Sequence, residues 1–306
     1  MDSAENRAYL SSLAGLERAM NTGAVVEGIV TLCDENMRLH VDLRCAEGII
    51  EADEAMYCRA GEKRKDIAII TRVGKAVACR VIGMERQGGK TVVRLSRRMV
   101  QQECMEYYLR TLRVGDIIPA RVTHMEPFGA FLDIGCGVSS LLSVDCISVS
   151  RISHPRDRLH NGMSIPVVVK SVQLDIQRIY VTLRELLGTW EENVKSFEVG
   201  QTVTGIIRSV ESYGVFVELT PNLAGLAEVA AGESDLLRKK IGQGVSVYIK
   251  SIVPERMKIK LVLIDTGTEI AESQLQFFVH AAETKHLSAW RYSPSSSEKL
   301  IETKFE

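Results

Sequence analysis

Two stretches of the sequence decide the fold: Pro127-Phe-Gly-Ala-Phe-Leu-Asp133 and Ser212-Tyr-Gly-Val-Phe-Val-Glu218. Both run in the order aromatic residue, glycine, small or branched residue, phenylalanine, apolar residue and acid. Both also follow a segment that opens on valine and glycine, at residues 114–122 and 199–207. Because two distant segments agree in the same order, we interpret them as parts of one repeating unit.

The repeat extends to both sides of these stretches. Downstream, residues 162–172 match residues 242–252, and both carry Lys-Ser after an apolar run. A weaker copy starts at residues 23–30 and resumes at 73–82. The opening glycines, Gly23, Gly115 and Gly200, lie 92 and 85 residues apart. This period is too long for one solenoid unit, and it predicts a chain of small domains.

Within the middle repeat, five short segments have the composition of β-strands. They are rich in β-branched residues and bounded by turn formers, and they cover residues 117–125, 128–134, 141–144, 167–175 and 179–183. An irregular stretch, 148–161, separates the third segment from the fourth. Five strands in so short a repeat predict a small closed barrel.

Helical periodicity replaces the strand pattern between the repeats. Val100, Cys104, Tyr108 and Leu112 recur every four residues, and so do apolar residues around Trp190. We predict that each linker helix docks one barrel on the next, with Trp190 in the interdomain core. A further helix is predicted over 268–289, followed by a mobile Ser/Pro-rich tail at 293–297.

These segments together resemble the S1 RNA-binding domain. The resemblance is carried by Phe-Gly-Ala-Phe-Leu-Asp, the Val-x-Val-Lys strand and the closing Arg-Ile-x-Val-Thr-Leu-Arg at 178–184. It covers residues 20–265, nearly throughout the middle repeat, clearly in the third and in degenerate form in the first. It implies a fold dominated by β-structure, with three tandem five-stranded OB-fold barrels of the S1 type, joined by short α-helices and flanked by N- and C-terminal helices.

The expected domains follow from this resemblance and from the helical segments. They are an N-terminal helical segment (1–19), a degenerate barrel 1 (20–98), a linker helix (99–113), barrel 2 (114–184), a second linker helix (185–198), barrel 3 (199–265), and a C-terminal helix with a flexible tail (266–306).

The resemblance also implies a single-stranded RNA-binding face on each barrel. Family members use two aromatics near the second strand, a His after the third, an Asp before the fifth and an Arg at its end. In barrel 2 the corresponding residues are Phe128, Phe131, Asp175 and Arg184, with Ser143 in place of His. In barrel 3 the two aromatics are Tyr213 and Phe216, and the positions of the His, Asp and Arg are held by Glu228, Pro254 and Ile264. In barrel 1 the corresponding residues are roughly Met37, His40, Glu51 and Arg98. Barrel 2 retains most of the pattern and is the predicted main binding unit.

The chemistry of these residues suits RNA, although alternatives stay open. Flat rings stack bases and cations contact phosphates. A spacing of three places residues on opposite faces of a regular strand, so both aromatics share a face only if the first lies in a turn or a bulge intervenes; otherwise one is core. Arg80, Lys170 and Lys250 recur at one outward position of the fourth strand. They face either phosphate or simply solvent.

Composition places the chain among ordinary soluble proteins. The net charge is −1, but residues 1–58 hold 4 Lys/Arg against 11 Asp/Glu, whereas residues 59–98 hold 12 against 3. Either this asymmetry builds a charged face or the two segments neutralise each other within barrel 1. The sequence shows no secretory signal and no membrane-length apolar run, so we expect a cytoplasmic protein without disulfides.

We expect a binding protein rather than an enzyme. The six histidines lack metal-ligand spacing, no Gly-x-Ser-x-Gly elbow is present, and no cofactor motif stands out. The favoured hypothesis is a short protein resembling ribosomal protein S1 that binds single-stranded mRNA or rRNA, with the ribosome as one candidate partner. The alternatives are a scaffold that docks on a ribosomal or transcription protein without RNA contact, and a small-ligand or oligosaccharide binder. The oligomeric state stays open.

Overall fold

The computed structural model describes residues 3–59, 61–229, 234–268 and 275–305. The chain divides into two compact units. Unit 1 holds residues 1–112, 133–139 and 173–178, and unit 2 holds residues 113–132, 140–172 and 179–306. Barrel 1 therefore lies in unit 1, barrel 3 in unit 2, and barrel 2 lies in unit 2 except for its two loop regions at 133–139 and 173–178.

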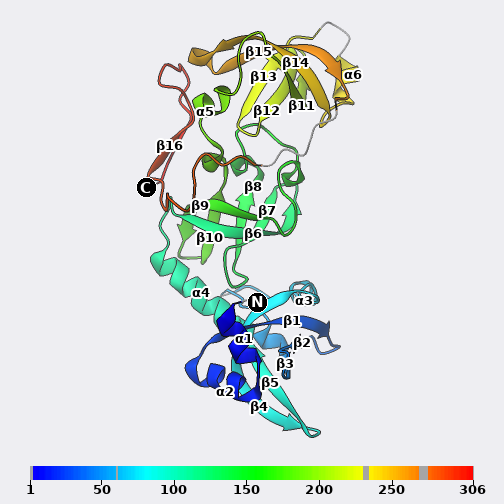
Figure 1. Cartoon of the computed structure of the whole chain (residues 1–306), viewed down its shortest axis with the longest axis vertical. Coiled ribbons are helices and arrows are strands. Elements are labelled where there is room, and N and C mark those ends of the chain that lie inside the picture. The colour runs from blue at the N-terminus through cyan, green and yellow to red at the C-terminus, as the bar shows by residue number, and fades with distance from the viewer. Residues whose placement is uncertain (1–2, 60, 230–233, 269–274, 306) are drawn as a thin grey trace. The chain divides into compact units, whose positions relative to one another are not determined.

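Unit 1 begins with two helices and continues into barrel 1 (Figure 1). Its elements are α1 (Ala4–Leu10), α2 (Leu13–Thr22), β1 (Val25–Cys33), β2 (Leu39–Asp42), β3 (Glu47–Ile50), η1 (Ala52–Glu54), α3 (Asp66–Ile70), β4 (Ala76–Gln87), β5 (Lys90–Ser96) and α4 (Arg97–Thr111). Ser3 and Ser12 cap α1 and α2 by accepting backbone N–H groups of the first turn.

Barrel 2 has the same order of five strands as barrel 1, and the second linker follows it. The elements are β6 (Ile117–Glu126), β7 (Gly129–Asp133), β8 (Ser139–Ser143), η2 (Val144–Cys146), η3 (Pro155–Asp157), β9 (Ser164–Gln173), β10 (Arg178–Thr182), η4 (Arg184–Leu187) and α5 (Trp190–Val194). Barrel 3 and the C-terminal segment comprise β11 (Thr202–Glu211), β12 (Gly214–Thr220), β13 (Leu223–Ala227), α6 (Ser234–Arg238), β14 (Gly244–Val253), η5 (Pro254–Arg256), β15 (Lys258–Thr266), β16 (Ala289–Arg291) and β17 (Glu302–Lys304).

Each barrel is a closed sheet of five strands, which confirms the predicted fold class. In all three, the third and fifth strands pair in parallel, as β3 with β5, β8 with β10 and β13 with β15. Alternate residues of every strand fill the barrel interior with Val, Ile and Leu. The predicted strands of the middle repeat overlap all five observed strands of barrel 2.

The first strand of barrels 1 and 3 carries a bulge, and the burial pattern of β6 indicates the same feature in barrel 2. The register of β1 against β2 shifts between Val30 and Leu32, and that of β11 against β12 shifts between Ile207 and Ser209. In β6 the same position shows two consecutive exposed residues, Thr123 and His124, where strict alternation would bury one. The bulge thus presents one extra side chain on the outer face next to the second strand.

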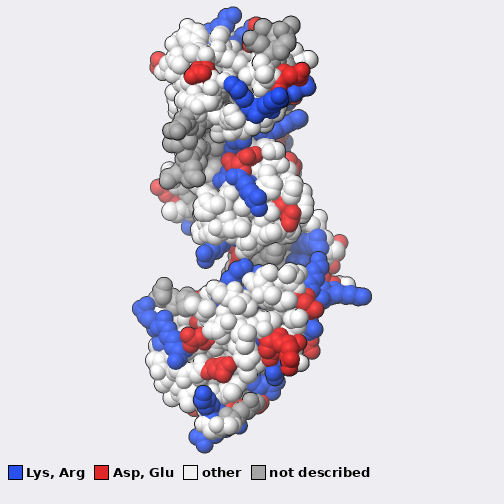
Figure 2. All heavy atoms as spheres, turned by 90° about the vertical axis from the view of Figure 1, so that its right-hand side faces the viewer, with Lys and Arg blue, Asp and Glu red and all other residues white. Residues whose placement is uncertain are grey.

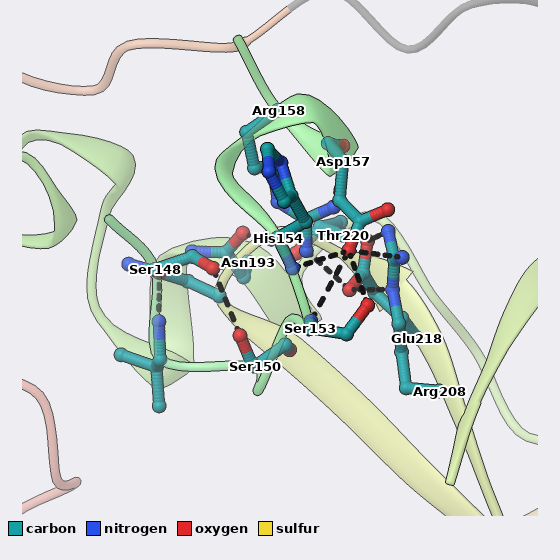
Figure 3. Close-up of polar contacts among 12 residues, drawn as sticks. Ser148, Ser150, Ser153, His154, Asp157, Arg158, Asn193, Arg208, Glu218 and Thr220 are labelled. Carbon is teal, nitrogen blue, oxygen red and sulfur yellow. Dashed lines mark hydrogen bonds and ion pairs between the residues drawn. The ribbon is translucent and has the colours of Figure 1, made fainter. Parts of the chain in front are cut away.

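Barrels 2 and 3 are joined within unit 2 by buried polar groups (Figure 3). Glu218 of β12 accepts hydrogen bonds from Arg158 of the 148–161 segment and from Arg208 of β11, and all three side chains are at most 9% exposed. Asp157 also pairs with Arg208 at 3.5 Å. Because removing one member would leave buried charge without a partner, this network holds the two barrels in one arrangement.

The aromatic residue of the second linker is buried. Trp190 is 2% exposed, and its backbone N–H donates to the carbonyl oxygen of Tyr292 at 3.0 Å. The observed helices in this linker are η4 and α5 rather than one continuous helix over 185–198. Gly188, at φ +85°, separates them, and a Cβ there would clash with the ring of Phe278.

The predicted C-terminal helix over 268–289 is wrong for residues 275–289, where the structure has turns and extended backbone; residues 269–274 lie outside the described residues. Here the backbone pairs with barrel 2, with Ile117 N donating to Lys285 O and Leu287 N to Gly115 O, both at 2.9 Å. Nor is the Ser/Pro-rich segment free of the fold. Ser293 is buried and accepts the N–H of Ile301 between β16 and β17.

Candidate nucleic-acid interface

Two aromatic rings lie together on the outer face of barrel 2. Phe128 occupies the turn before β7 and is 54% exposed, while Phe131 of β7 is half-buried. Their ring centroids are 6.0 Å apart and their planes meet at 90°. The turn position of Phe128 is the reason that both rings share one face despite their spacing of three.

A glycine makes this arrangement possible. A Cβ at Gly129 would stand 2.5 Å from the carbonyl oxygen of Leu142 and 3.0 Å from Cα of Ser143 on β8. The two strands therefore approach closely only because residue 129 lacks a side chain. The backbone N–H of Val144 bonds to Phe128 O at 3.0 Å and fixes the turn beside β8.

Barrel 3 repeats the aromatic pair with nearly the same geometry. Tyr213 lies in the turn before β12 and is 62% exposed, and its ring centroid is 6.3 Å from that of Phe216 at 87°. A Cβ at Gly214 would stand 2.6 Å from Ala227 O of β13. The common Phe/Tyr-Gly-x-Phe signature thus builds the same surface feature in both barrels.

A third ring, which the sequence pattern did not indicate, joins the pair in barrel 2. His124 of β6 lies beside Phe131 with a centroid distance of 6.2 Å and an interplanar angle of 23°. Its Nε2 atom is 2.6 Å from Glu126 Oε1, and its side chain is 61% exposed. The sequence pattern did not predict this position of His124, because it follows from a bulge in the first strand, and a bulge depends on strand pairing and not on residue type.

Lys170 places a cation on the exposed face of β9. Its Nζ lies 3.1 Å from Sγ of the buried Cys146 and donates to it, and this hydrogen bond raises the lysine's pKa. Asp145 lies next to this group, and its pKa is lowered, chiefly by a hydrogen bond from Ser143. Lys170 therefore remains charged at neutral pH, and Asp145 is a second group that the sequence analysis missed.

Arg184 and Asp175 occupy different surroundings. The Arg184 side chain is 29% exposed, donates to Glu185 Oε1 at 3.2 Å and reaches Thr303 Oγ1 of β17 at 3.4 Å. Asp175 is exposed in the turn between β9 and β10, and it belongs to unit 1, whereas the aromatic rings and Lys170 belong to unit 2.

Lys250, the third-barrel counterpart of Lys170, is exposed on β14. Of the other three positions of the family pattern in barrel 3, Glu228 is exposed and Ile264 is 56% exposed, whereas Pro254 is partly buried at the start of η5. Barrel 3 therefore combines two rings and one cation with an acid and an aliphatic side chain.

In barrel 1 the candidate cations are paired with carboxylates. Arg80 lies 2.5 Å from Glu103 of α4, and Arg98 lies 2.6 Å from Glu54 of η1. The ring of His40 stands between Glu47, at 2.7 Å from Nδ1, and a second carboxylate, Asp34, at 3.6 Å from Nε2.

Some basic residues of segment 59–98 form ion pairs with acidic residues of segment 1–58. Arg64 and Arg98 of the basic segment pair with Asp53 and Glu54 of the acidic segment. Figure 2 shows Lys/Arg and Asp/Glu interspersed over the visible face rather than separated into two regions. These contacts favour neutralisation within the barrel over a single basic face.

The described residues offer no second class of site by metal ligation or membrane crossing. They contain no group of three or more His, Cys, Asp or Glu side chains placed to hold a metal ion. Within the same part of the chain, the helices all fall short of the length and apolar character required to cross a membrane.

Comparison with known proteins points to one domain family. Residues 111–184 match the model of the S1 RNA binding domain. Small ribosomal subunit protein bS1 of Staphylococcus aureus (strain COL) is 29% identical over 216 residues, which cover 65% of this chain and 54% of the relative. The bS1 homolog of Bacillus subtilis (strain 168) is 28% identical over 201 residues, covering 64% and 50%. The chain thus spans about half the length of the curated relatives it matches.

Solved structures give similar matches. A multidomain protein with nucleic acid binding domains from Streptococcus pneumoniae TIGR4 matches 81% of this chain and 75% of its own at 15% identity, with a TM-score of 0.24. GSP13 from Bacillus subtilis matches 24% of this chain and 57% of its own at 20% identity, with a TM-score of 0.23.

Proposed function

Because the chain is an S1-domain protein similar to small ribosomal subunit protein bS1, we propose that it binds single-stranded RNA in translation or mRNA handling, with barrel 2 as the main binding unit. The observation that carries this proposal is the pair formed by the exposed Phe128 and the half-buried Phe131, on the same barrel as the charged Lys170. We propose a binding role without catalysis.

Barrel 2 combines the two interactions that single-stranded RNA needs. Exposed rings stack bases without regard to sequence, and each stacked base contributes about 1–3 kcal/mol. Lys170 and Arg184 supply positive charge for phosphates, and both lie close enough to Asp145 to lower its pKa. Since Asp145 offsets part of this charge, stacking should contribute more to affinity than ion pairing does.

The proposed ligand, partner and cellular location follow from the names of the relatives. Two of them are named as small ribosomal subunit proteins or homologs of one, so we propose mRNA or rRNA as the ligand, the ribosome as partner and the cytoplasm as location. Barrel 3 would then add a second, weaker RNA contact through Tyr213 and Phe216.

The test is fluorescence anisotropy of a labelled single-stranded RNA of about 20 nucleotides, enough for more than one OB-type barrel. Phe131→Ala should weaken binding by about tenfold, because it removes one stacking ring. The matched control is Tyr107→Ala, which removes an exposed aromatic ring from α4, outside the barrels. Equal affinity of Phe131→Ala and the parent, or no binding by the parent at low salt, would contradict the proposal.

A second candidate function is docking of barrel 1 on a protein partner. It is favoured by the paired cations of barrel 1 and by apolar side chains that α3 exposes, with Ile67 63% and Ile70 42% exposed. A pull-down with the full chain, treated with RNase, tests it. A partner that is retained after RNase treatment supports docking, and a partner that is lost with the RNA argues against it.

A further inference from the structure

His124 lies at a position of the first strand where the other two barrels have a side chain without a ring. The bulge in the first strand places Leu32 opposite His40 in barrel 1 and Ser209 opposite Phe216 in barrel 3. His124 occupies the equivalent place beside Phe131 in barrel 2. The three barrels therefore offer an aliphatic side chain, an imidazole and a hydroxyl at one and the same surface position.

The imidazole continues the aromatic surface of barrel 2. Phe128, Phe131 and His124 follow one another with centroid separations of 6.0 and 6.2 Å. The planes of His124 and Phe131 differ by only 23°, so the two rings are nearly parallel. Phe128 and His124 are both more than half exposed, which leaves ring surface for contact with a base.

The surrounding contacts hold His124 in this orientation without burying it. Glu126, two residues further along β6, bonds to Nε2 at 2.6 Å. Thr123, the other residue of the bulge, donates from Oγ1 to Phe131 O at 3.0 Å and ties the bulge to β7. A ring that is held in place loses less conformational freedom when a base stacks on it.

We propose that His124 is a third base-stacking residue of barrel 2, which gives this barrel one more base contact than barrel 3 has. The inference rests on the proposed function, because it assigns a further residue to the same RNA-binding face. It also gives a reason to expect stronger binding by barrel 2. Ser143 stands at the position that the family usually fills with His, and His124 supplies a ring from another strand of the same barrel.

The alternative role for an exposed histidine is a contact with phosphate, and salt dependence separates the two. A lost phosphate contact lowers the slope of log K against log salt concentration by about 0.7 for single strands, whereas a lost stacking contact leaves the slope unchanged. The carboxylate of Glu126 on Nε2 opposes an approach of phosphate to that atom.

The experiment exchanges the side chains found at this one position. His124→Ser, which copies barrel 3, should weaken binding of the 20-nucleotide RNA by about fivefold, the low end for one stacked base, with an unchanged salt slope. His124→Phe should restore parental affinity, because it keeps a flat ring without charge. Ser209→His should tighten binding, because it adds a ring beside Phe216. Thermal unfolding of each variant should match that of the parent, since the replaced side chains are exposed or partly exposed.

The outcomes separate this inference from the proposed function. If Phe131→Ala weakens binding while His124→Ser does not, His124 has no role and the binding face stands. If His124→Lys retains affinity and His124→Phe loses it, the residue contacts phosphate and the stacking role is wrong. If neither Phe131→Ala nor His124→Ser affects binding, the face itself is misassigned.

Discussion

Barrels 1 and 2 share one fold but differ in what their outer faces offer to a ligand. At the strand-four position, Arg80 of barrel 1 contacts a carboxylate, whereas Lys170 of barrel 2 contacts the thiol of Cys146. At the end of the fifth strand, Arg98 of barrel 1 and Arg184 of barrel 2 both contact a carboxylate. A neutral thiol does not offset the charge of Lys170, and the nearby Asp145 offsets it only in part, whereas a carboxylate at 2.5–2.6 Å forms a direct ion pair with Arg80 or Arg98. The barrel provides the positions, and the neighbouring side chains decide whether a cation there can attract phosphate.

The two aromatic positions also suit a ligand better in barrel 2 than in barrel 1. Where barrel 2 has Phe128 in the turn, barrel 1 has Met37, which adopts φ 61° and packs against the core of barrel 1. Where barrel 2 has Phe131, barrel 1 has His40 between two carboxylates. Barrel 1 thus lacks an exposed pair of flat rings at these positions, and the comparison predicts that it contributes little to RNA affinity.

The largest expected effect comes from removing both rings of barrel 2. The double variant Phe128→Ala/Phe131→Ala should weaken RNA binding by about a hundredfold, because two stacking contacts are lost. His40→Ala in barrel 1 should leave affinity near the parental value. Anisotropy titrations measure both, with circular dichroism as a check of folding. A comparable loss in His40→Ala would break the contrast between the barrels.

A smaller effect is expected from the equivalent cations of the fourth strand. Lys170→Ala should lower affinity a few-fold and reduce the salt slope by about 0.7, because one phosphate contact is removed. Arg80→Ala should leave the slope unchanged, since Glu103 already neutralises Arg80. Titrations at several salt concentrations give both slopes. Equal slopes for the two variants would show that the ion pair does not screen Arg80.

The converse change should make barrel 1 more like barrel 2. Glu103→Gln removes the carboxylate from Arg80, and we expect RNA affinity to rise about twofold, with a salt slope steeper by up to about 0.7. Glu106→Gln is the matched control, because it removes the same charge from α4 where its side chain accepts from Gln102. An equal gain in both variants would assign the effect to net charge alone.

The smallest effect concerns the acid stability of barrel 1. Burial raises the pKa of Glu54, but hydrogen bonds from Arg98 and Ser96 outweigh it and hold the pKa below its usual value. The carboxylate therefore stabilises the fold above the unfolded-state pKa, about 4.3, and this contribution is lost as pH falls through the lower folded-state value. The difference in unfolding temperature between the parent and Glu54→Gln should be present at pH 7 and shrink at about pH 3. A difference that does not change with pH would argue against the ionised pair.

Local patterns accounted for the barrels and for part of the candidate site. Strand composition and the aromatic-Gly-x-Phe signature are local, and a strand hairpin brings Phe128 and Phe131 together over a short stretch of chain. The same local reasoning was wrong for residues 275–289. Their apolar spacing fits a helix, but backbone pairing with Gly115 and Ile117 decides their conformation, and that pairing joins segments far apart in sequence.

The sequence by itself determined that the chain forms three small barrels and that barrels 2 and 3 carry an aromatic pair, because alternation and turn residues act between near neighbours, whereas the structure decided that both rings of each pair lie on one face. Only the tertiary structure decided which charged groups meet. Arg158 and Glu218 lie 60 residues apart, and Arg80 and Glu103 belong to different elements, so no pattern of residue types pairs them. It also placed His124 beside Phe131, because a bulge arises from the pairing of two strands and leaves no signature in either one.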